Sequence, residues 1–148
     1  MALWLFKQEP DCYGFADLQR DGGTTWDGVA NALAQKHLRA TRPGDRVFFY
    51  HTGKEKAVVG VMRVTGGPHP DPADATGRAV VVAVEPVRAL AHPVTLAAIK
   101  ADPAFADWEL VRVARLSVMP VTARQWARVE ELSEAPPAAA TPPKRAAK

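Results

Sequence analysis

A tryptophan and a carboxamide stand five positions apart, on either side of a turn signal, in this chain of 148 residues. Trp26 precedes the pair Asp27-Gly28, which is typical of tight turns, and Asn31 follows. An indole stacks on flat ligands, and a primary amide both donates and accepts hydrogen bonds at the edge of a heterocycle. The segment is therefore a candidate nucleobase site, with a core tryptophan beside an ordinary turn as the alternative interpretation.

A second group of polar residues follows the apolar N-terminal segment. Lys7 and Glu9 alternate, so their side chains point to the same side of an extended chain. This arrangement allows a shared pocket lining, acid–base catalysis or, as the default interpretation, a salt bridge between them. Cys12 is the only cysteine, which excludes an internal disulfide and a cysteine-rich zinc site. We expect Cys12 to be a small buried apolar residue, with a nucleophilic pair of Cys12 and a histidine as the weaker alternative.

Enzyme signatures are sparse in the sequence. It contains no phosphate-binding loop, no glycine-rich dinucleotide motif, and no zinc-protease or serine-hydrolase motif. Its four histidines lack the paired spacing of metal ligands. We therefore expect no metal, no other cofactor and no catalytic activity. The alternative, an RNA-processing enzyme, would have to use Lys7, Glu9 or His51.

The composition is that of an ordinary globular protein, with 47% hydrophobic and 24% charged residues. No apolar run reaches the length of a membrane span, and the N-terminus lacks the pattern of a signal peptide. A single cysteine fits a reducing compartment. We expect a cytoplasmic monomer that does not bind membranes.

The formal net charge of +3 belongs to the C-terminal segment, because residues 135–148 carry three basic side chains and no acidic one. The rest of the chain is neutral overall, which argues against strong nonspecific coating of duplexes. The charge is nevertheless uneven, since from Ala30 to Arg63 there are seven basic residues and two acidic ones. That stretch either contacts phosphates or is a solvated surface.

The elements that must position these residues are short. Hydrophobic patterns predict strands at residues 2–6, 24–26, 46–50, 57–65, 78–87 and 116–121. Helices are predicted at residues 15–20, 31–40 and 95–100, and after the capping-box sequence at 122–125. Trp126, Val129 and Leu132 recur on one face of that last helix, as core residues do. Residues 51–56 suggest a hairpin, and the residues 66–77, rich in Gly and Pro, a surface loop.

Several short strands with helices inserted between them predict an α+β fold, a small mixed β-barrel flanked by short helices. The folded domain should span residues 1–134. The segment 135–148 is rich in Ala, Pro and Lys, cannot bury a core, and is predicted to be disordered.

Several motifs stand in an order known from one protein family: Trp4-Leu-Phe-Lys7, Glu9-Pro10-Asp11, Trp26-Asp-Gly-Val29 with Asn31, Phe48-Phe-Tyr-His51 and Arg115-Leu-Ser-Val118. Together they resemble the EVE domain family over residues 3 to about 132. The resemblance implies a PUA-like barrel. It also implies a pocket in which a modified or flipped-out nucleobase of DNA or RNA is held.

The resemblance also assigns roles to individual residues. Trp26 would stack on the base, and Asn31 would bond to the base edge. The other ligand-binding residues would be Lys7, Glu9, His51, Thr52, Ser117 and Val118. Ala30 stands where the family often has an arginine, which removes a bidentate phosphate contact, and Lys36 and Arg39 would partly replace it.

Three hypotheses follow for the function. The leading one is a non-enzymatic domain that reads a modified base in DNA or RNA. The second is a binder of a free nucleoside-like small molecule, whose affinity would not depend on salt as phosphate contacts do. The third is the RNA-processing enzyme.

Overall fold

The computed structural model describes residues 1–134 of the chain. The strands are β1 (Leu3–Gln8), β2 (Thr24–Trp26), β3 (Arg46–His51), β4 (Ala57–Pro70), β5 (Val80–Thr95) and β6 (Val118–Pro120). The helices are α1 (Pro10–Tyr13), α2 (Phe15–Asp21), α3 (Ala32–Ala40), α4 (Leu96–Ala101), α5 (Glu109–Arg112) and α6 (Ala123–Glu134), with a 3₁₀ turn at Pro103–Phe105. The predicted disordered segment, 135–148, lies outside the described residues.

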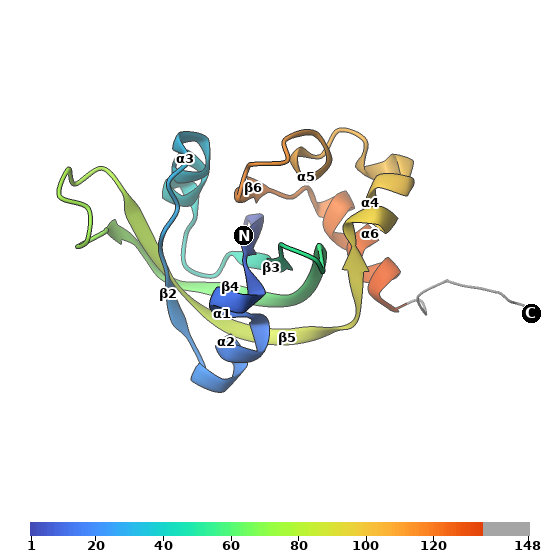
Figure 1. Cartoon of the computed structure of the whole chain (residues 1–148), viewed down its shortest axis with the longest axis horizontal. Helices are drawn as coiled ribbons and strands as arrows, with labels where there is room; N and C mark the ends of the chain where they lie inside the picture. The colour runs from blue at the N-terminus through green and yellow to red at the C-terminus, as the bar shows by residue number, and fades with distance from the viewer. Residues whose placement is uncertain (135–148) are drawn as a thin grey trace, which may run out of the picture.

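All six strands form one mixed sheet in the order β2-β5-β4-β3-β1-β6. β3, β4 and β5 run antiparallel, β1 lies parallel to β3, and β2 and β6 form the two edges. Several register shifts interrupt the β4–β5 ladder. Such bulges bend a ribbon and increase its twist, and Figure 1 shows β4 and β5 curving across the molecule as a half-barrel. The predicted fold class, a PUA-like mixed barrel with short helices, is confirmed.

The two faces of the sheet bury different aromatic clusters, because neighbouring strand residues point to opposite sides. On one face the ring of Phe48 stacks on Trp126 of α6, with centroids 3.6 Å apart. On the other face Phe49 packs edge-on against Phe15 of α2 and against Trp26 of β2. The central strands are therefore covered on both faces, and the ends of these strands are where side chains reach solvent.

Close packing of α2 on the sheet depends on one glycine. A Cβ at Gly60 of β4 would lie 2.4 Å from the ring of Phe15, well inside van der Waals contact. Glycine at this position lets the ring lie directly on the strand backbone. The position of α2, and of α1 before it, is thereby fixed relative to the end of β1.

Most predicted elements are confirmed within a few residues, including the capping box of α6. Thr122 Oγ1 accepts the Gln125 N–H at 3.1 Å, and the Thr122 N–H donates to the Gln125 side chain at 2.9 Å. The predicted loop at 66–77 is wrong at residues 66–70, because β4 continues to Pro70. Register shifts around Gly66 accommodate the Gly and Pro residues of this segment, so its pairing with β5 continues. β5 likewise extends to Thr95 instead of ending at residue 87.

Within residues 1–134 no helix is long and apolar enough to cross a bilayer.

Candidate functional site

The end of β1 divides the predicted site residues between two faces of the sheet. Lys7 is paired in register with Tyr50 of β3, and Gln8 is paired with His51. Since partners across a ladder point to the same side, Lys7 and Tyr50 share one face, and Gln8 and His51 share the other. The second face is the one that carries Trp26, because Trp26 packs against Phe49 two residues before His51.

A cavity of about 170 Å³ opens beside β2 on the Trp26 face. We call it the Trp26 pocket, and its lining residues are Gln8, Tyr13, Thr24, Thr25, Trp26 and Asp27. Its walls come from the end of β1, from α1 and from β2. Because β2 is an edge strand, the backbone N–H and C=O groups on its side away from β5 are free to bond a ligand.

The indole of Trp26 is mostly buried in the core, and only a small part of its surface lines this pocket. Its residue is 3% exposed, and the ring lies 5.4 Å from Phe6 and 5.3 Å from Phe49, centroid to centroid. Both neighbours contact the ring within aromatic packing distance, so the indole forms a floor more than an open stacking face. The structure therefore favours the core-residue interpretation of Trp26 for most of the ring surface.

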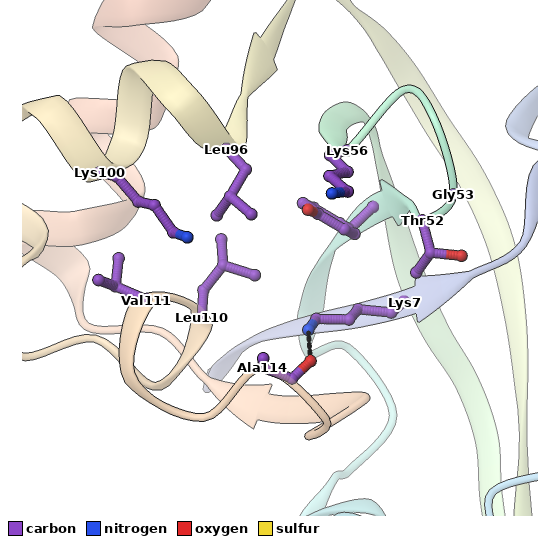
Figure 2. Close-up of a pocket in the computed structure, with 10 residues that line it drawn as sticks. Lys7, Thr52, Gly53, Lys56, Leu96, Lys100, Leu110, Val111 and Ala114 are labelled. Atoms are coloured by element: carbon purple, nitrogen blue, oxygen red, sulfur yellow. Dashed lines mark hydrogen bonds between the residues drawn. The ribbon is translucent and has the colours of Figure 1, made fainter.

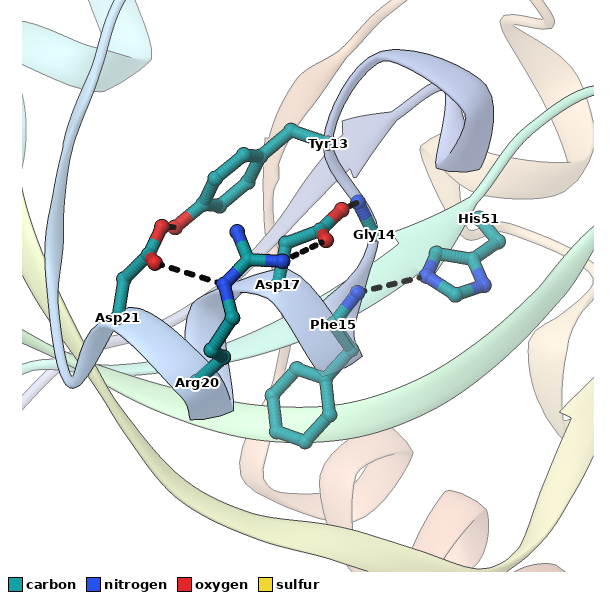
Figure 3. A network of polar contacts seen from close by, with 7 residues as sticks. All are labelled: Tyr13, Gly14, Phe15, Asp17, Arg20, Asp21 and His51. Carbon is teal, nitrogen blue, oxygen red and sulfur yellow. Dashed lines mark hydrogen bonds and ion pairs between the residues drawn. The ribbon is translucent and has the colours of Figure 1, made fainter.

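Tyr13 is the more accessible aromatic ring of the Trp26 pocket, and a polar network holds it (Figure 3). The Tyr13 hydroxyl donates to Asp21 at 2.8 Å, and Arg20 links Asp21 to Asp17 with bonds of 3.1 and 3.0 Å. Asp17 in turn accepts the Gly14 N–H at 2.8 Å. Burial and the bond to Asp21 raise the pKa of the Tyr13 phenol, which keeps it a hydrogen-bond donor.

Gln8 brings an amide to the same pocket. Its Oε1 accepts the Glu9 N–H at 2.9 Å, which orients the side chain and leaves the amide NH₂ to donate into the pocket. The combination of an amide with a tyrosine ring and an indole edge is suited to a flat ligand that carries hydrogen-bond acceptors.

Asn31 acts locally as the N-cap of α3. Its Oδ1 accepts the Ala34 N–H at 2.9 Å, and the residue is exposed and outside the lining of the Trp26 pocket. The segment before it is held by Gln35, which donates to Val29 O at 2.7 Å and accepts the Val80 N–H at 2.9 Å. Asn31 can therefore contact a ligand only where that ligand extends beyond the pocket, through its amide nitrogen.

Lys36 and Arg39 lie on the exposed side of α3. Arg39 donates to Arg78 O at 2.6 Å and lines a shallow depression of about 460 Å³ between α3 and the start of β5. Ala30 belongs to the same depression.

His51 makes hydrogen bonds within the protein through both of its ring nitrogens. Its Nε2 accepts the Phe15 N–H at 3.0 Å (Figure 3). The proton is therefore on Nδ1, which donates to Glu55 at 2.7 Å. Both ring nitrogens are therefore occupied, and the imidazole joins α2 to the β3–β4 hairpin.

The predicted salt bridge between Lys7 and Glu9 is wrong. β1 ends at Gln8 and Glu9 is the N-cap of α1, so the alternation of an extended chain stops before Glu9. Lys7 Nζ instead donates to Ala114 O at 2.9 Å, while Glu9 accepts the Thr52 hydroxyl at 3.2 Å.

The remaining predicted residues surround Lys7 and the first strand. Thr52 lines a second cavity together with Lys7. Ser117 accepts the Lys7 backbone N–H through its carbonyl oxygen at 2.9 Å. Val118 is 0% exposed and paired with Phe6, so its side chain belongs to the core.

An EVE domain profile matches residues 2–132, nearly all of the described chain. The chain belongs to the EVE domain family. Among curated relatives, human thymocyte nuclear protein 1 is 36% identical in an alignment of 80 residues that covers 46% of this chain and 36% of that protein. The match thus spans about a third of the relative's length.

Two solved structures have the same fold over most of this chain. A protein from Rhodopseudomonas palustris, solved by NMR, is 41% identical with a TM-score of 0.85, covering 90% of this chain and 93% of that one. The crystal structure of human THYN1 protein in complex with DNA containing 5-methylcytosine is 28% identical with a TM-score of 0.80, covering 93% and 100% of the two chains.

Trp26 is the one predicted site residue that lines this EVE domain's Trp26 pocket, and the other five lining residues were not predicted: Gln8, Tyr13, Thr24, Thr25 and Asp27. Tyr13 follows the Glu9-Pro10-Asp11 motif, and a proline after a strand is a signal for a helix start that turns the next residues back over the strand end. Cys12, expected to be buried, is exposed on α1, because the buried positions here are taken by Phe15 and Leu18 of α2.

Proposed function

We propose that this EVE domain binds DNA by holding a flipped-out modified base in the Trp26 pocket. The observation that supports it most is the human THYN1 protein with 5-methylcytosine DNA, which has the same fold over 93% of this chain. The residues that line the pocket also offer aromatic rings and hydrogen-bonding groups that suit a base.

The size of the Trp26 pocket restricts the ligand. Its 170 Å³ is well below the roughly 300–1,000 Å³ of pockets that enclose drug-sized molecules. A single heterocycle fits, while its sugar and phosphates stay outside. A base inside a duplex cannot reach such a cavity, so the nucleotide must leave the stack, at a cost of a few kcal/mol.

The contacts that offset this cost come from three elements. The Tyr13 ring stacks on the base, and base–aromatic stacking contributes roughly 1–3 kcal/mol. The Gln8 amide and the free backbone groups of β2 bond to the base edge. An added methyl group lies against the apolar edge of Trp26.

Phosphates flanking the flipped base would meet the basic side of α3, through Lys36 and Arg39. Two phosphate contacts give a slope of about −2 in the logarithm of affinity against the logarithm of salt concentration, by the rule of roughly 0.9 per contact. RNA and a free nucleoside are the alternative ligands, and a free nucleoside would show no such slope.

We further propose that the domain acts by binding alone. His51 has both ring nitrogens in structural bonds, and the carboxylate of Glu9 is bonded to Thr52. Neither is free to form an acid–base pair with the other across the pocket. Turnover of a nucleic-acid substrate that is lost on substituting Lys7 would support an enzyme instead.

The test is fluorescence anisotropy with a DNA duplex carrying one central 5-methylcytosine, and with the unmodified duplex as the comparison. We expect at least about fivefold preference for the modified duplex and at least about tenfold weaker binding by Tyr13→Ala, since roughly 1–3 kcal/mol of stacking is lost. Tyr13→Phe keeps the ring and should bind like the parent. Cys12→Ala, an exposed change on the same helix, is the matched control.

Equal affinity for the two duplexes, or unchanged binding by Tyr13→Ala, would refute the proposal. Repeating the titration with modified RNA and with the free nucleoside separates the three ligand classes.

A cytoplasmic location and a monomeric state stay predictions. The curated relatives are named thymocyte nuclear proteins, and that name indicates a nuclear location for those relatives.

A further inference from the structure

A second cavity, of about 250 Å³, lies on the face of β1 opposite the Trp26 pocket. We call it the lysine pocket, and Figure 2 shows most of the side chains around it. Its lining residues are Lys7, Tyr50, Thr52, Gly53, Lys56, Leu96, Lys100, Leu110, Val111 and Ala114. Three of these are lysines and none is acidic, so every charged side chain that lines the cavity is positive.

The three lysines come from three separate elements. Lys7 rises from β1, Lys56 from the end of the β3–β4 hairpin, and Lys100 from α4 (Figure 2). The Leu96 N–H donates to Lys56 O at 2.7 Å, which fixes the hairpin against the start of α4. Three lysines from separate elements therefore line one cavity, although their like charges repel.

Lys7 is the innermost of the three. Its Nζ donates one hydrogen bond to Ala114 O at 2.9 Å and lies 5.6 Å from the centre of the Tyr50 ring. An ammonium group has three N–H donors, so two remain for a ligand. Burial lowers the pKa of Lys7, and an anion beside it would reverse that effect.

Tyr50 adds a hydrogen-bond donor to the wall of the lysine pocket. The residue is 3% exposed, lines the cavity, and its hydroxyl has no hydrogen-bond partner among residues 1–134. Among residues 1–134 the buried polar side-chain atom without a partner is Arg46 Nε, so the Tyr50 hydroxyl is reached by solvent at the cavity wall and is available to an acceptor. Burial raises the pKa of Tyr50 to about 12, so the hydroxyl stays protonated and can only donate to an anion.

We propose that the lysine pocket binds a phosphate monoester whose organic group is apolar or aromatic. A dianionic phosphate has three terminal oxygens and accepts from several directions, which matches three ammonium groups and the hydroxyl of Tyr50. The organic group would lie on Leu96, Leu110 and Val111. A carboxylate has one charge and two oxygens and would leave part of this donor set unused.

Two sources supply this chemistry, a free phosphate ester and the terminal phosphate of a nucleic-acid strand. Internal phosphates of a strand are diesters with one charge each and do not match the site as well. The site lies on the other face of β1 from the proposed base pocket, so it does not depend on the proposed function.

The probe is phenyl phosphate, titrated into the whole chain and followed by NMR and calorimetry, with inorganic phosphate as the comparison. We expect saturable binding, stronger than that of inorganic phosphate, with shifts at Tyr50 and Leu96. Lys100→Ala and Lys56→Ala should each weaken it about tenfold. Lys54→Ala is the matched control, because it removes the same charge from the same hairpin without removing a side chain of the lysine pocket.

Absence of saturable binding, or equal loss in Lys54→Ala and Lys100→Ala, would overturn the proposal. Tyr50→Phe removes only the hydroxyl and should weaken binding several-fold while leaving the unfolding temperature nearly unchanged; full affinity in that variant would also count against the site. A short strand with a 5′-phosphate is then compared with the same strand ending in a 5′-hydroxyl. A preference for the phosphate that disappears in Lys100→Ala assigns the site to strand ends, and equal binding of the two strands assigns it to free esters.

Discussion

Replacing Trp26 and replacing Tyr13 should have opposite consequences for stability and binding. Trp26 is 3% exposed and packs within 5.4 Å of Phe6 and 5.3 Å of Phe49, so Trp26→Ala removes a fully packed indole. Truncating a buried tryptophan costs about 3–5 kcal/mol, because the transfer free energy of the ring is lost and a cavity is left. We expect a loss of about 4 kcal/mol in the free energy of unfolding.

The loss should be visible in urea unfolding and in calorimetry. For a domain of this size, each kcal/mol corresponds to roughly 3–4 °C in the midpoint, so Trp26→Ala should melt about 12–16 °C lower. Tyr13→Ala removes a less buried ring and one exposed hydrogen bond to Asp21, and should cost only about 1 kcal/mol. Binding of the 5-methylcytosine duplex should fall in Tyr13→Ala under conditions where that variant is fully folded.

A loss below about 1 kcal/mol in Trp26→Ala would refute this reasoning, since it would mean that the indole is not a core group. Trp26→Phe is the control that separates packing from stacking. It retains an aromatic ring in the core and should recover most of the stability, and any binding deficit left in it reports the contact of the indole edge with the base.

Two other predictions concern buried polar groups. Asp45 accepts three hydrogen bonds, including those of Trp4 Nε1 at 2.9 Å and the Arg42 N–H at 2.9 Å. Asp45→Ala leaves these donors unpaired, so the free energy of unfolding measured in urea should fall by about 3 kcal/mol. A fall of less than about 1 kcal/mol would contradict this prediction. The depressed pKa of Lys7 means that the unfolded chain binds more protons than the native one between that pKa and 10.5. Stability should therefore rise with pH over this interval, and the rise should be smaller in Lys7→Met but unchanged in Lys54→Met. An identical pH dependence in the two variants would show that Lys7 is not the group responsible.

Local patterns were sufficient to predict most of the fold. The capping box at Thr122–Gln125 forms both of its reciprocal bonds, and Trp126 lies on the core face that the three-residue spacing indicated. These features depend on residues close together in the chain. The extent of β4 was not predictable in this way, because bulges around Gly66 keep a segment rich in Gly and Pro in the sheet.

The site was harder to predict because it depends on which way side chains point. The spacing of Trp26 and Asn31 suggested two groups facing one ligand, yet the indole turns into the core and Asn31 caps α3. Neither outcome can be read from residue types, since a core tryptophan and a pocket tryptophan have the same sequence signature. Likewise the alternation of Lys7 and Glu9 holds only while the strand continues, and the helix start at Pro10 ends it.

The two proposed binding sites lie on opposite faces of one short strand. β1 is held on both sides, by β3 and by β6, so its backbone has little freedom to shift. Gln8 then faces a small pocket with an aromatic ring and edge-bonding groups, and Lys7, one position earlier, faces a cationic cavity. Because the two side chains lie on opposite faces, the sheet separates the proposed base pocket, whose one charged lining residue is Asp27, from the cationic cavity proposed to bind phosphate. A single open groove could not provide both, since water and salt would screen the lysines and their charges would attract diester phosphate into the base site.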